Sequence, residues 1–225
     1  MRMIRTTPYA DRVDAGRVLA EHLVEHLGRP CVVVGIPRGG VLVADPIAER
    51  LDCPLTMSFA RKLTLPESPE VAFGAIDEDG HVVVDHPRFH DLAGRPHDLF
   101  RARARVAQEI QRQQQAFPAL GLDAFLPRCT VLLVDDGLAT GYTMRAAIAH
   151  AIRHGAHRIV AATPCASASA AAEIECEVDA FVCPRIDAAF FAVGEYYLNF
   201  DPVTDEQVLA VLDKARERSR GRAQA

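Results

Sequence analysis

The sequence lacks the apolar segments that secretion or membrane insertion requires. The first residues contain no apolar core of a signal peptide, and no apolar run in the 225 residues reaches the length of about 20 residues that a membrane-spanning helix needs. These absences indicate a soluble, cytoplasmic protein with no membrane partner.

Two common nucleotide-binding signatures and a positive net charge are also missing. Neither Gly-x-x-x-x-Gly-Lys-Ser/Thr nor Gly-x-Gly-x-x-Gly occurs, so neither a P-loop nor a dinucleotide site has support. The formal net charge is −5 at pH 7. This charge argues against a nucleic-acid partner, whose backbone is densely negative.

Cysteine occurs six times, but never as a Cys-x-x-Cys pair. Cys31, Cys129 and Cys183 lie beside apolar segments that are expected to form strands. We therefore predict small, buried, unpaired side chains in a reducing compartment, rather than a disulfide framework or a zinc site.

The apolar segments predict alternating strands and helices. Hydrophobic residues make up 49% of the chain, which is enough for one core in a single domain over residues 1–218. The alternation is typical of an α/β fold with a mainly parallel sheet flanked by helices. We also expect a helical insertion at about 86–128 and a disordered tail at 219–225. The expected strands are 31–36, 55–61, 71–76, 81–84, 129–135, 158–163 and 178–183, and the pair 71–76 and 81–84 is expected to form a hairpin. The expected helices are 11–27, 41–51, 98–117, 142–154, 167–176 and 205–217.

The segment 131–143 carries the strongest chemical signal. Residues 131–134 are apolar and predict a strand covered on both faces; Asp135 and Asp136 follow at its carboxyl end, where open α/β sheets bind ligands. Residues 139–143 then lead into a helix, whose free N–H groups favour an anion. Adjacent carboxylates suit neutral sugar hydroxyls rather than the phosphate itself. A sugar phosphate therefore fits the whole segment.

Two other interpretations of this segment stay open. Haloacid dehalogenase phosphatases also place Asp after an apolar strand, but with an Asp-x-Asp spacing, whereas Asp135 and Asp136 are adjacent and would point to opposite sides of a strand. Alternatively, Asp and Gly form only a tight turn that caps a helix. We favour the sugar phosphate over both.

A second candidate loop, 35–40, follows the first predicted strand. Pro37 stiffens it, Gly39 and Gly40 allow the backbone to approach a ligand closely, and Arg38 offers bidentate donors for phosphate. An ordinary strand-to-helix turn would contain the same residues. Further on, Pro46 is expected to kink the next helix or to move its start.

A third candidate site begins at Arg61 and Lys62. The stretch 62–70 is rich in proline and polar residues and is expected to be irregular. Lys62 is one of only two lysines in the chain, and its compact charge would suit pyrophosphate oxygens. A lysine that extends to solvent from a strand end is an equally good interpretation.

The order of an apolar strand, Asp-Asp, small residues and Thr-Gly-x-Thr resembles the phosphoribosyl pyrophosphate (PRPP) signature of type I phosphoribosyltransferases. The resemblance implies that Asp135 and Asp136 hold the ribose hydroxyls. It implies that the 5-phosphate is bound by Ala139, Thr140, Gly141, Tyr142 and Thr143, and the pyrophosphate by Pro37, Arg38, Gly39 and Gly40. Tyr142 stands where many members have a second glycine, but only its backbone N–H is needed.

The same resemblance implies a cofactor and a closing loop. Mg²⁺ is expected to arrive with PRPP and to be reached by Asp135 and Asp136 through water, with no direct protein ligand. Residues 62–70, with Arg61 and Lys62, are expected to close over the reacting centre and exclude water. The order of Pro-Arg-Gly-Gly, Arg-Lys, Pro-Glu and Val-Thr-Asp-Glu is also similar to a group of bacterial stand-alone predicted phosphoribosyltransferases of unassigned acceptor.

An aromatic cluster near the C-terminus is the candidate acceptor pocket. Phe190, Tyr196 and Tyr197 could stack on a planar base, although core or interface packing is the commoner fate of such residues. The resemblance implies that the segment at about 185–203, which contains this cluster, forms a hood over the carboxyl edge of the sheet. A homodimer is compatible with this hood.

Several charged or titratable groups are expected to lie on solvated helix faces. They include the pattern His22-Leu-Val-Glu-His26, which matches an inverted zinc-protease motif, and the pair His150 and His154. In the helix 98–117, Val106, Ile110 and Phe117 form a stripe that would dock the insertion, while its arginines are either solvated or add positive potential.

The sequence thus favours a transferase that moves the 5-phosphoribosyl group of PRPP to an unidentified nitrogenous acceptor. A regulatory module that binds PRPP without transferase activity is the alternative, and a phosphatase is less favoured.

Overall fold

A computed structural model describes residues 7–26, 30–91, 95–117, 121–126 and 128–223. Its centre is a five-stranded sheet in which every neighbouring pair is parallel. The strand order is β2 (Leu55–Met57), β1 (Cys31–Gly35), β6 (Thr130–Val134), β7 (Ile159–Ala162) and β9 (Ala180–Val182). All five residues of β1 and of β6 are buried, as expected for strands covered on both faces.

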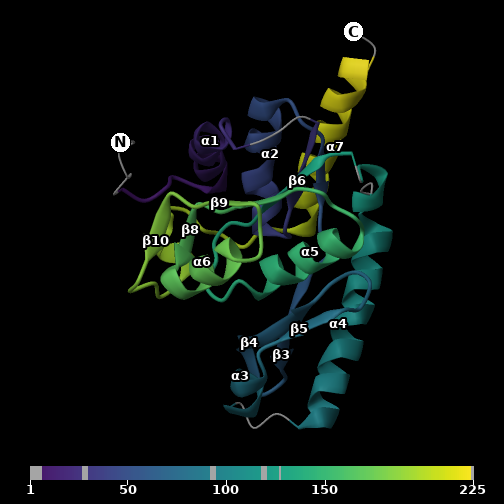
Figure 1. Ribbon diagram of the computed structural model, residues 1–225, viewed down its shortest axis with the longest axis vertical. Helices are drawn as coiled ribbons and strands as arrows, with labels where there is room; N and C mark the ends of the chain where they lie inside the picture. Colours follow the sequence, from purple (N-terminus) through teal and green to yellow (C-terminus); the bar gives the residue numbers. More distant parts are fainter. Residues whose placement is uncertain (1–6, 27–29, 92–94, 118–120, 127, 224–225) are drawn as a thin grey trace.

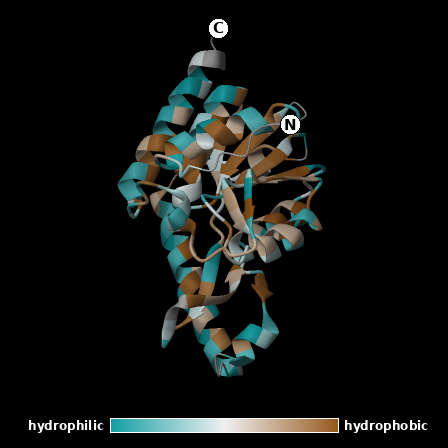
Figure 2. Cartoon of the chain, turned by 90° about the vertical axis from the view of Figure 1, so that its left-hand side faces the viewer, coloured by the Kyte–Doolittle hydropathy of each residue, from teal (hydrophilic) through white to brown (hydrophobic). Residues whose placement is uncertain are grey.

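Helices cover the two faces of this sheet, and alternate residues of the strands supply the two cores. Val33 and Leu132 pack with α1 (Arg12–Leu23) and α2 (Gly39–Leu51), whereas Val34 and Leu133 pack with α5 (Tyr142–Arg153) and α6 (Ala168–Glu175). The two layers of helices are visible in Figure 1, and Figure 2 shows that hydrophobic residues concentrate between the layers. The predicted fold, a mainly parallel sheet flanked by helices, is confirmed.

A second, antiparallel sheet lies beside α5 and contains β3 (Arg61–Leu65), β4 (Ser68–Ile76) and β5 (Val82–Val84). The hairpin of β4 and β5 confirms the prediction for residues 71–84. The prediction that 62–70 is irregular was wrong, because β3 and β4 continue through it. Leu63 and Leu65 are buried at alternate positions of β3, and this period-two pattern outweighs the prolines.

Two helices accompany this antiparallel sheet: α3 (His86–Asp91) and the long α4 (Pro96–Ala116). The predicted stripe on the second of them is confirmed. Val106, Ile110 and Phe117 are buried in one cluster with Leu63 and Phe73, so the stripe docks α4 onto the antiparallel sheet. The same cluster contains Val208 and Leu212 of α7 (Asp205–Ala223).

Several element boundaries differ from the predictions. The helix α1 ends at Leu23, and α2 begins at Gly39 and continues past Pro46 without interruption. The helix α7 continues to Ala223, so residues 219–223 are helical where a disordered tail was predicted. A capping box precedes this helix, because Thr204 N donates to Gln207 Oε1 and Gln207 N donates to Thr204 Oγ1.

Some elements were too short to be predicted. The strands β8 (Cys165–Ser167) and β10 (Arg185–Asp187) form a two-stranded parallel sheet, and short 3-10 turns occur at η1 (Leu122–Ala124) and η2 (Val193–Tyr196). Each is only three or four residues long. Such segments are too short to show a recognisable alternation of apolar and polar residues. Among the described residues, no helix has the length and apolarity to cross a membrane.

One cysteine pair contradicts the prediction of unpaired thiols. Cys31 and Cys53 form a disulfide with a Cα–Cα distance of 6.0 Å. The prediction failed because the pairing depends on the register of β1 against β2, which residue spacing does not reveal. Cys129, Cys165, Cys176 and Cys183 are free, although Cys176 is exposed rather than buried.

Candidate functional site

The three predicted loops line one cavity at the carboxyl edge of the central sheet. Its volume is about 620 Å³. It lies where open parallel sheets bind ligands, because β1 and β6 both end there and α2 and α5 both begin there. The predicted residues that line it are Pro37, Arg38, Gly39, Arg61, Lys62, Asp135, Asp136, Ala139, Thr140, Gly141 and Thr143.

Asp136 is held from two sides. Its carboxylate Oδ2 accepts a hydrogen bond of 2.8 Å from Arg12 Nε, and its backbone carbonyl accepts one of 2.6 Å from the Tyr197 hydroxyl. Burial is the main reason that the pKa of Tyr197 is raised, so this hydroxyl stays protonated as a donor. The strand end and these two contacts fix the carboxylate at the cavity wall.

Arg12 is a site residue that the sequence did not reveal. Besides its bond to Asp136, its Nη1 donates to the Asp201 carbonyl at 2.9 Å, and its guanidinium carbon lies 3.9 Å from the centre of the Phe200 ring. No motif surrounds this arginine, and its partner is 124 residues away in sequence. Only the packing of α1 against the sheet edge brings it to the cavity.

Asp135 is in a different electrostatic environment from its neighbour. The residue lines the cavity and retains some accessible surface, but desolvation by the surrounding protein is the main reason that its pKa is raised well above the usual value. The negative charge of Asp136 raises the pKa further, while Lys62 opposes the rise. The carboxyl group of Asp135 therefore ionises less readily than an ordinary aspartate side chain.

The glycines of the second loop let it pack against the Asp-Asp loop. A Cβ at Gly39 would lie 1.8 Å from Asp136 Oδ2, and one at Gly40 would lie 2.5 Å from the Val134 carbonyl oxygen. The prediction gave these glycines the role of approaching a ligand. The structure shows both glycines in close contact with a protein neighbour, and only Gly39 belongs to the cavity lining. The Pro37–Arg38 peptide bond is cis.

The third part of the cavity is the N-terminus of α5. Gly141 precedes the helix with φ of 72°, a conformation that favours glycine. The backbone N–H groups of the first turn have no partner within the helix and are suited to an anion. The Tyr142 side chain is buried away from the cavity, where its hydroxyl donates to Asp85 Oδ2 at 2.6 Å, so that only its backbone could take part.

Cationic side chains outnumber carboxyl groups around the cavity. Five basic residues line the cavity: Arg12, Arg38, Arg61, Lys62 and Arg105. They face three acidic residues, Glu109, Asp135 and Asp136, which leaves an excess of two positive charges when all are ionised. Because the whole chain carries a net charge of −5, this local excess distinguishes the cavity and favours an anionic ligand.

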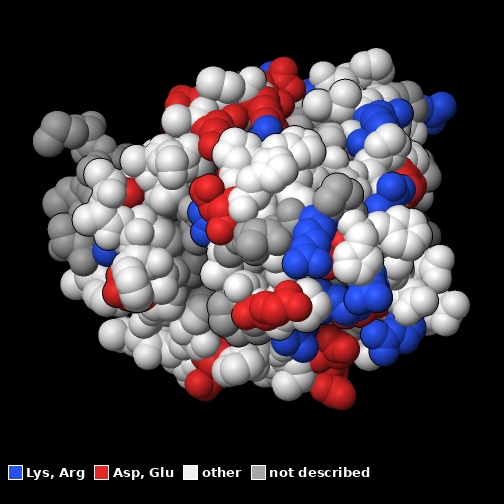
Figure 3. All heavy atoms as spheres, turned by 90° about the horizontal axis from the view of Figure 1, so that it is seen from below, with Lys and Arg blue, Asp and Glu red and all other residues white. Residues whose placement is uncertain are grey.

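The antiparallel sheet and α4 hold some of these cations. Arg61 donates from Nε to Gln113 at 3.0 Å and from Nη1 to Glu109 at 3.2 Å, while Arg105 donates to the Thr64 carbonyl at 3.1 Å. Lys62 is exposed. On the lower face of the molecule, basic groups gather on the side where α4 lies, with acidic groups between them (Figure 3).

The aromatic residues predicted for an acceptor pocket lie elsewhere. Phe190, Tyr196 and Tyr197 do not line the cavity; the two tyrosines are buried in a cluster with Tyr9 and Cys165, and Phe190 packs against that cluster. The hood residues that line the cavity are instead Val193, Phe200, Pro202 and Val203. The difference arises because the larger part of the aromatic cluster forms core, as aromatic residues usually do.

The prediction for His150 and His154 was also wrong. His150 is buried, and both imidazoles contact Asp79 in the turn between β4 and β5. The helix face was expected to be solvated because the antiparallel sheet that covers it could not be placed from the sequence.

Comparison with known proteins assigns the chain to a family. Residues 9–95 and 101–199 match the family described as "Phosphoribosyl transferase domain". The chain is 41% identical over 210 residues to proteins of two Mycobacterium tuberculosis strains named "Putative phosphoribosyl transferase". These matches cover 92% of the chain but 47% of the relatives, so the chain spans about half of their length.

A solved structure is similar over almost its entire length. A crystal structure of a Thermus thermophilus protein has 36% sequence identity and a TM-score of 0.72, with 92% of this chain and 99% of that chain covered. The family match extends over both the Asp135–Asp136 segment and the Arg38–Gly40 loop. This chain belongs to the phosphoribosyl transferase domain family.

Proposed function

We propose that the protein transfers the 5-phosphoribosyl group of PRPP to a nitrogenous acceptor and releases pyrophosphate. The observation that carries the proposal is the convergence of three elements on one cavity: the Asp135–Asp136 strand end, the α5 N-terminus and the loop of Arg38 and Gly39. Their chemistry is complementary to the ribose hydroxyls, the 5-phosphate and the pyrophosphate, respectively.

Each end of PRPP has a distinct binding group in this proposal. The N–H groups of residues 139–143 and the hydroxyls of Thr140 and Thr143 bind the 5-phosphate. Asp136, fixed by Arg12, accepts hydrogen bonds from the ribose. Arg38, Lys62 and Arg61 supply positive charge on the pyrophosphate side, with Gly39 and Gly40 at the start of α2.

The proposed reaction exchanges one bond at ribose C1 for another. The bond from C1 to the pyrophosphate oxygen breaks, the acceptor nitrogen forms the new bond to C1, and the acceptor loses a proton. Because positive charge develops on the ribose ring and negative charge on the leaving group, fixed charges at the cavity wall stabilise the transition state. No covalent bond to the protein is needed.

Mg²⁺ fits the oxygen-rich wall of the cavity. Asp135 and Asp136 offer the carboxylate oxygens that this ion prefers, and both line the cavity. In the proposal they contact the ion through water while PRPP carries it. Bound Mg²⁺ would add positive charge to the departing pyrophosphate.

One observation favours the alternative of a PRPP-binding regulatory module. Among the described residues that line the cavity, Phe200 has the only aromatic ring, and Arg12 already covers that ring at 3.9 Å. An aromatic platform for an acceptor base is therefore not evident in the described cavity. The two functions share the PRPP site and differ in whether pyrophosphate is released.

The deciding experiment measures pyrophosphate when the protein is mixed with PRPP, Mg²⁺ and a panel of nucleobases and amines. Acceptor-dependent release is expected, and Asp136→Asn should reduce it about 10- to 100-fold, because a hydrogen bond to a charged group contributes about 1.5–3 kcal/mol. Asp213→Asn, on the exposed face of α7, is the matched control. PRPP binding without release on any acceptor would favour the regulatory module, and release of phosphate from phosphomonoesters without PRPP would favour a phosphatase.

A further inference from the structure

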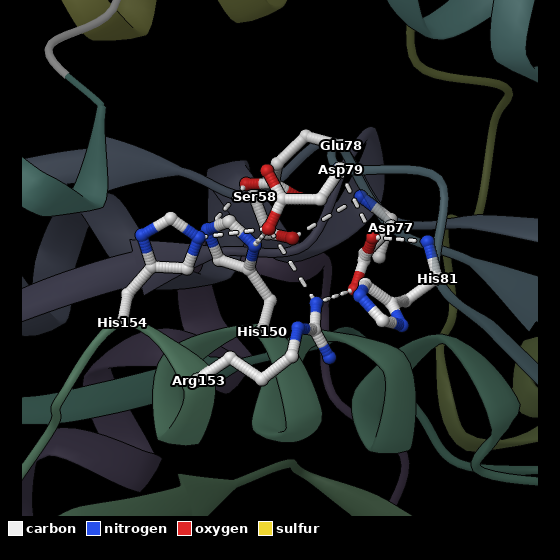
Figure 4. Close-up of polar contacts among 9 residues, drawn as sticks. Ser58, Asp77, Glu78, Asp79, His81, His150, Arg153 and His154 are labelled. Atoms are coloured by element: carbon white, nitrogen blue, oxygen red, sulfur yellow. Dashed lines mark hydrogen bonds and ion pairs between the residues drawn. The ribbon is translucent and has the colours of Figure 1, made fainter.

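His150 of α5 and His154, the residue that follows the helix, converge on one carboxylate oxygen outside the cavity. His150 Nδ1 lies 3.0 Å from Asp79 Oδ2, and His154 Nε2 lies 2.7 Å from the same oxygen. The two residues are four positions apart, which places them on one helix face, and their ring centres are 4.2 Å apart. Asp79 comes from the turn between β4 and β5, so both elements contribute to the cluster (Figure 4).

Glu78 supplies a second, independent observation. Its Oε1 lies 3.4 Å from His150 Nε2, so the imidazole is contacted by a carboxylate on each of its two ring nitrogens. Its other oxygen, Oε2, is buried and has no hydrogen-bond partner in the part of the chain that the structure describes. A buried, unpartnered carboxylate oxygen is costly, and its presence beside two imidazoles points to a positively charged ligand.

We propose that Asp79, His150 and His154 bind a divalent metal ion of the zinc class, with Glu78 orienting the His150 ring. The three ligand atoms lie within 4.8 Å of one another. Zinc bonds to nitrogen and oxygen of about 2.0–2.2 Å separate ligand atoms in a tetrahedron by about 3.3–3.6 Å. Lengthening the contacts of Asp79 Oδ2 with the two imidazoles, now 3.0 and 2.7 Å, by about 0.3–0.9 Å would therefore admit the ion.

The contact to Glu78 matches the usual surroundings of a zinc-bound histidine. A metal-ligating imidazole generally donates its second ring N–H to a carboxylate, which fixes the tautomer and the ring orientation. In this cluster His150 would bind the ion through Nδ1 and donate from Nε2 to Glu78. The side chain of His150 is 7% exposed, so its ring is already confined by packing.

The charge of the cluster also suits a divalent ion. Asp77, Glu78 and Asp79 are consecutive, and the arginine that contacts them is Arg153, which pairs with Asp77 and lies 3.5 Å from Asp79 Oδ2. Three ionised carboxylates and this one guanidinium leave two negative charges when the imidazoles are neutral. A divalent ion would balance these charges, and imidazole ligands favour zinc over the oxygen-preferring Mg²⁺.

A network of hydrogen bonds without metal is the competing explanation. Such a network would also join the hairpin to α5. It leaves Glu78 Oε2 without a donor among the described residues, while Asp79 Oδ2 is approached by His150, His154 and Arg153. A cation bound between Asp79, His150 and His154 would compensate the negative charge of Asp79 and of the buried Glu78 carboxylate together, which the network without metal does not.

The test is a Zn²⁺ titration of the tag-free, full-length chain after treatment with a chelator. One ion per chain is expected. His154→Ala should weaken binding by at least about 100-fold because a direct ligand is lost, and Glu78→Gln by about 10- to 100-fold because an outer-shell partner is lost. His157→Ala, on an exposed residue next to the cluster, and His22→Ala, in the other histidine pair, should bind Zn²⁺ like the original protein.

A Co²⁺ titration gives a second readout that does not depend on transferase activity. The original protein should show the intense visible absorption of a four-coordinate site with nitrogen and oxygen ligands, and His154→Ala should not. Circular dichroism establishes that each variant is folded. The proposal is overturned if the original protein binds no Zn²⁺ at micromolar concentrations, if folded His154→Ala or Glu78→Gln binds as tightly, or if His22→Ala abolishes binding. If His154→Ala does not fold, Glu78→Gln and the original protein still decide the outcome.

Discussion

Asp135 and Asp136 show how two adjacent carboxyl groups of one motif acquire different properties. Asp136 is fixed by Arg12, whereas Asp135 is enclosed and has a raised pKa. The sequence placed both residues at the end of a buried strand, because that prediction rests on a local apolar pattern. It could not predict Arg12 or the hydroxyl of Tyr197, because those contacts depend on how distant segments pack.

The raised pKa of Asp135 leads to a pH-dependent prediction. The folded protein disfavours the ionised form of the Asp135 carboxyl group. The resulting loss of stability is absent below the pKa of an unfolded aspartate, about 3.9. It grows as the pH rises toward the pKa of Asp135 in the folded protein. Asp135→Asn, which is neutral throughout, should therefore gain stability relative to the original protein as the pH rises above about 4. Each unit of pKa elevation corresponds to about 1.4 kcal/mol.

Urea unfolding of both proteins at a series of pH values measures this difference. A difference in the free energy of unfolding that stays constant, or that falls as the pH rises, would show that the environment of Asp135 is not as described.

Substitutions at Gly39 and at Gly40 test the contact between the two loops in two different ways. A Cβ at residue 39 meets the Asp136 side chain, whereas a Cβ at residue 40 meets backbone at Val134 and Asp135. Gly39→Ala should therefore displace the Asp136 carboxylate and weaken PRPP binding more than it lowers stability. Gly40→Ala should lower the free energy of unfolding by about 1–3 kcal/mol, the usual cost of overpacking.

Thermal unfolding and PRPP titration of both variants separate these effects. Gly221→Ala is the control, because a Cβ there meets nothing within 4 Å in the helix α7, and it should be neutral or slightly stabilising. Equal behaviour of Gly39→Ala and Gly221→Ala would contradict the close approach.

At the scale of elements, sequence patterns predicted the central sheet well and its attachments less well. Runs such as residues 131–134 identify buried strands without knowledge of their neighbours. The strand β3 was missed because its two buried leucines lie in a stretch rich in proline. The position of the antiparallel sheet against α5 was also missed, and with it the burial of His150, because such docking has no local signature.

The docking of α4 can be tested at Ile110. This residue is 2% exposed and packs with buried residues of the antiparallel sheet and α7. Ile110→Ala should lower the free energy of unfolding by about 2–5 kcal/mol, since it leaves a cavity in a closed core. Gln111→Ala, one residue along on the exposed face, should change it by no more than about 0.5 kcal/mol. Similar small effects of both substitutions in urea unfolding would show that the stripe is not buried.

For the whole molecule, the cavity joins segments from almost the full length of the chain. Its lining extends from Arg12 in α1 to Val203 just before α7. Three short motifs in the sequence predicted which segments meet at the cavity. The aromatic residues predicted for an acceptor pocket do not line it, because the identity of the hood residues at the cavity depends on which aromatic side chains enter the core.

The central claim is that this cavity binds PRPP through the carboxylate of Asp136. Calorimetric titration of PRPP in the presence of Mg²⁺ tests it most directly, with Asp136→Asn and Asp213→Asn compared under the same conditions. One PRPP per chain is expected, with affinity reduced about 10- to 100-fold in Asp136→Asn and unchanged in Asp213→Asn. No binding to the original protein, or equal affinity in all three proteins, would contradict the account.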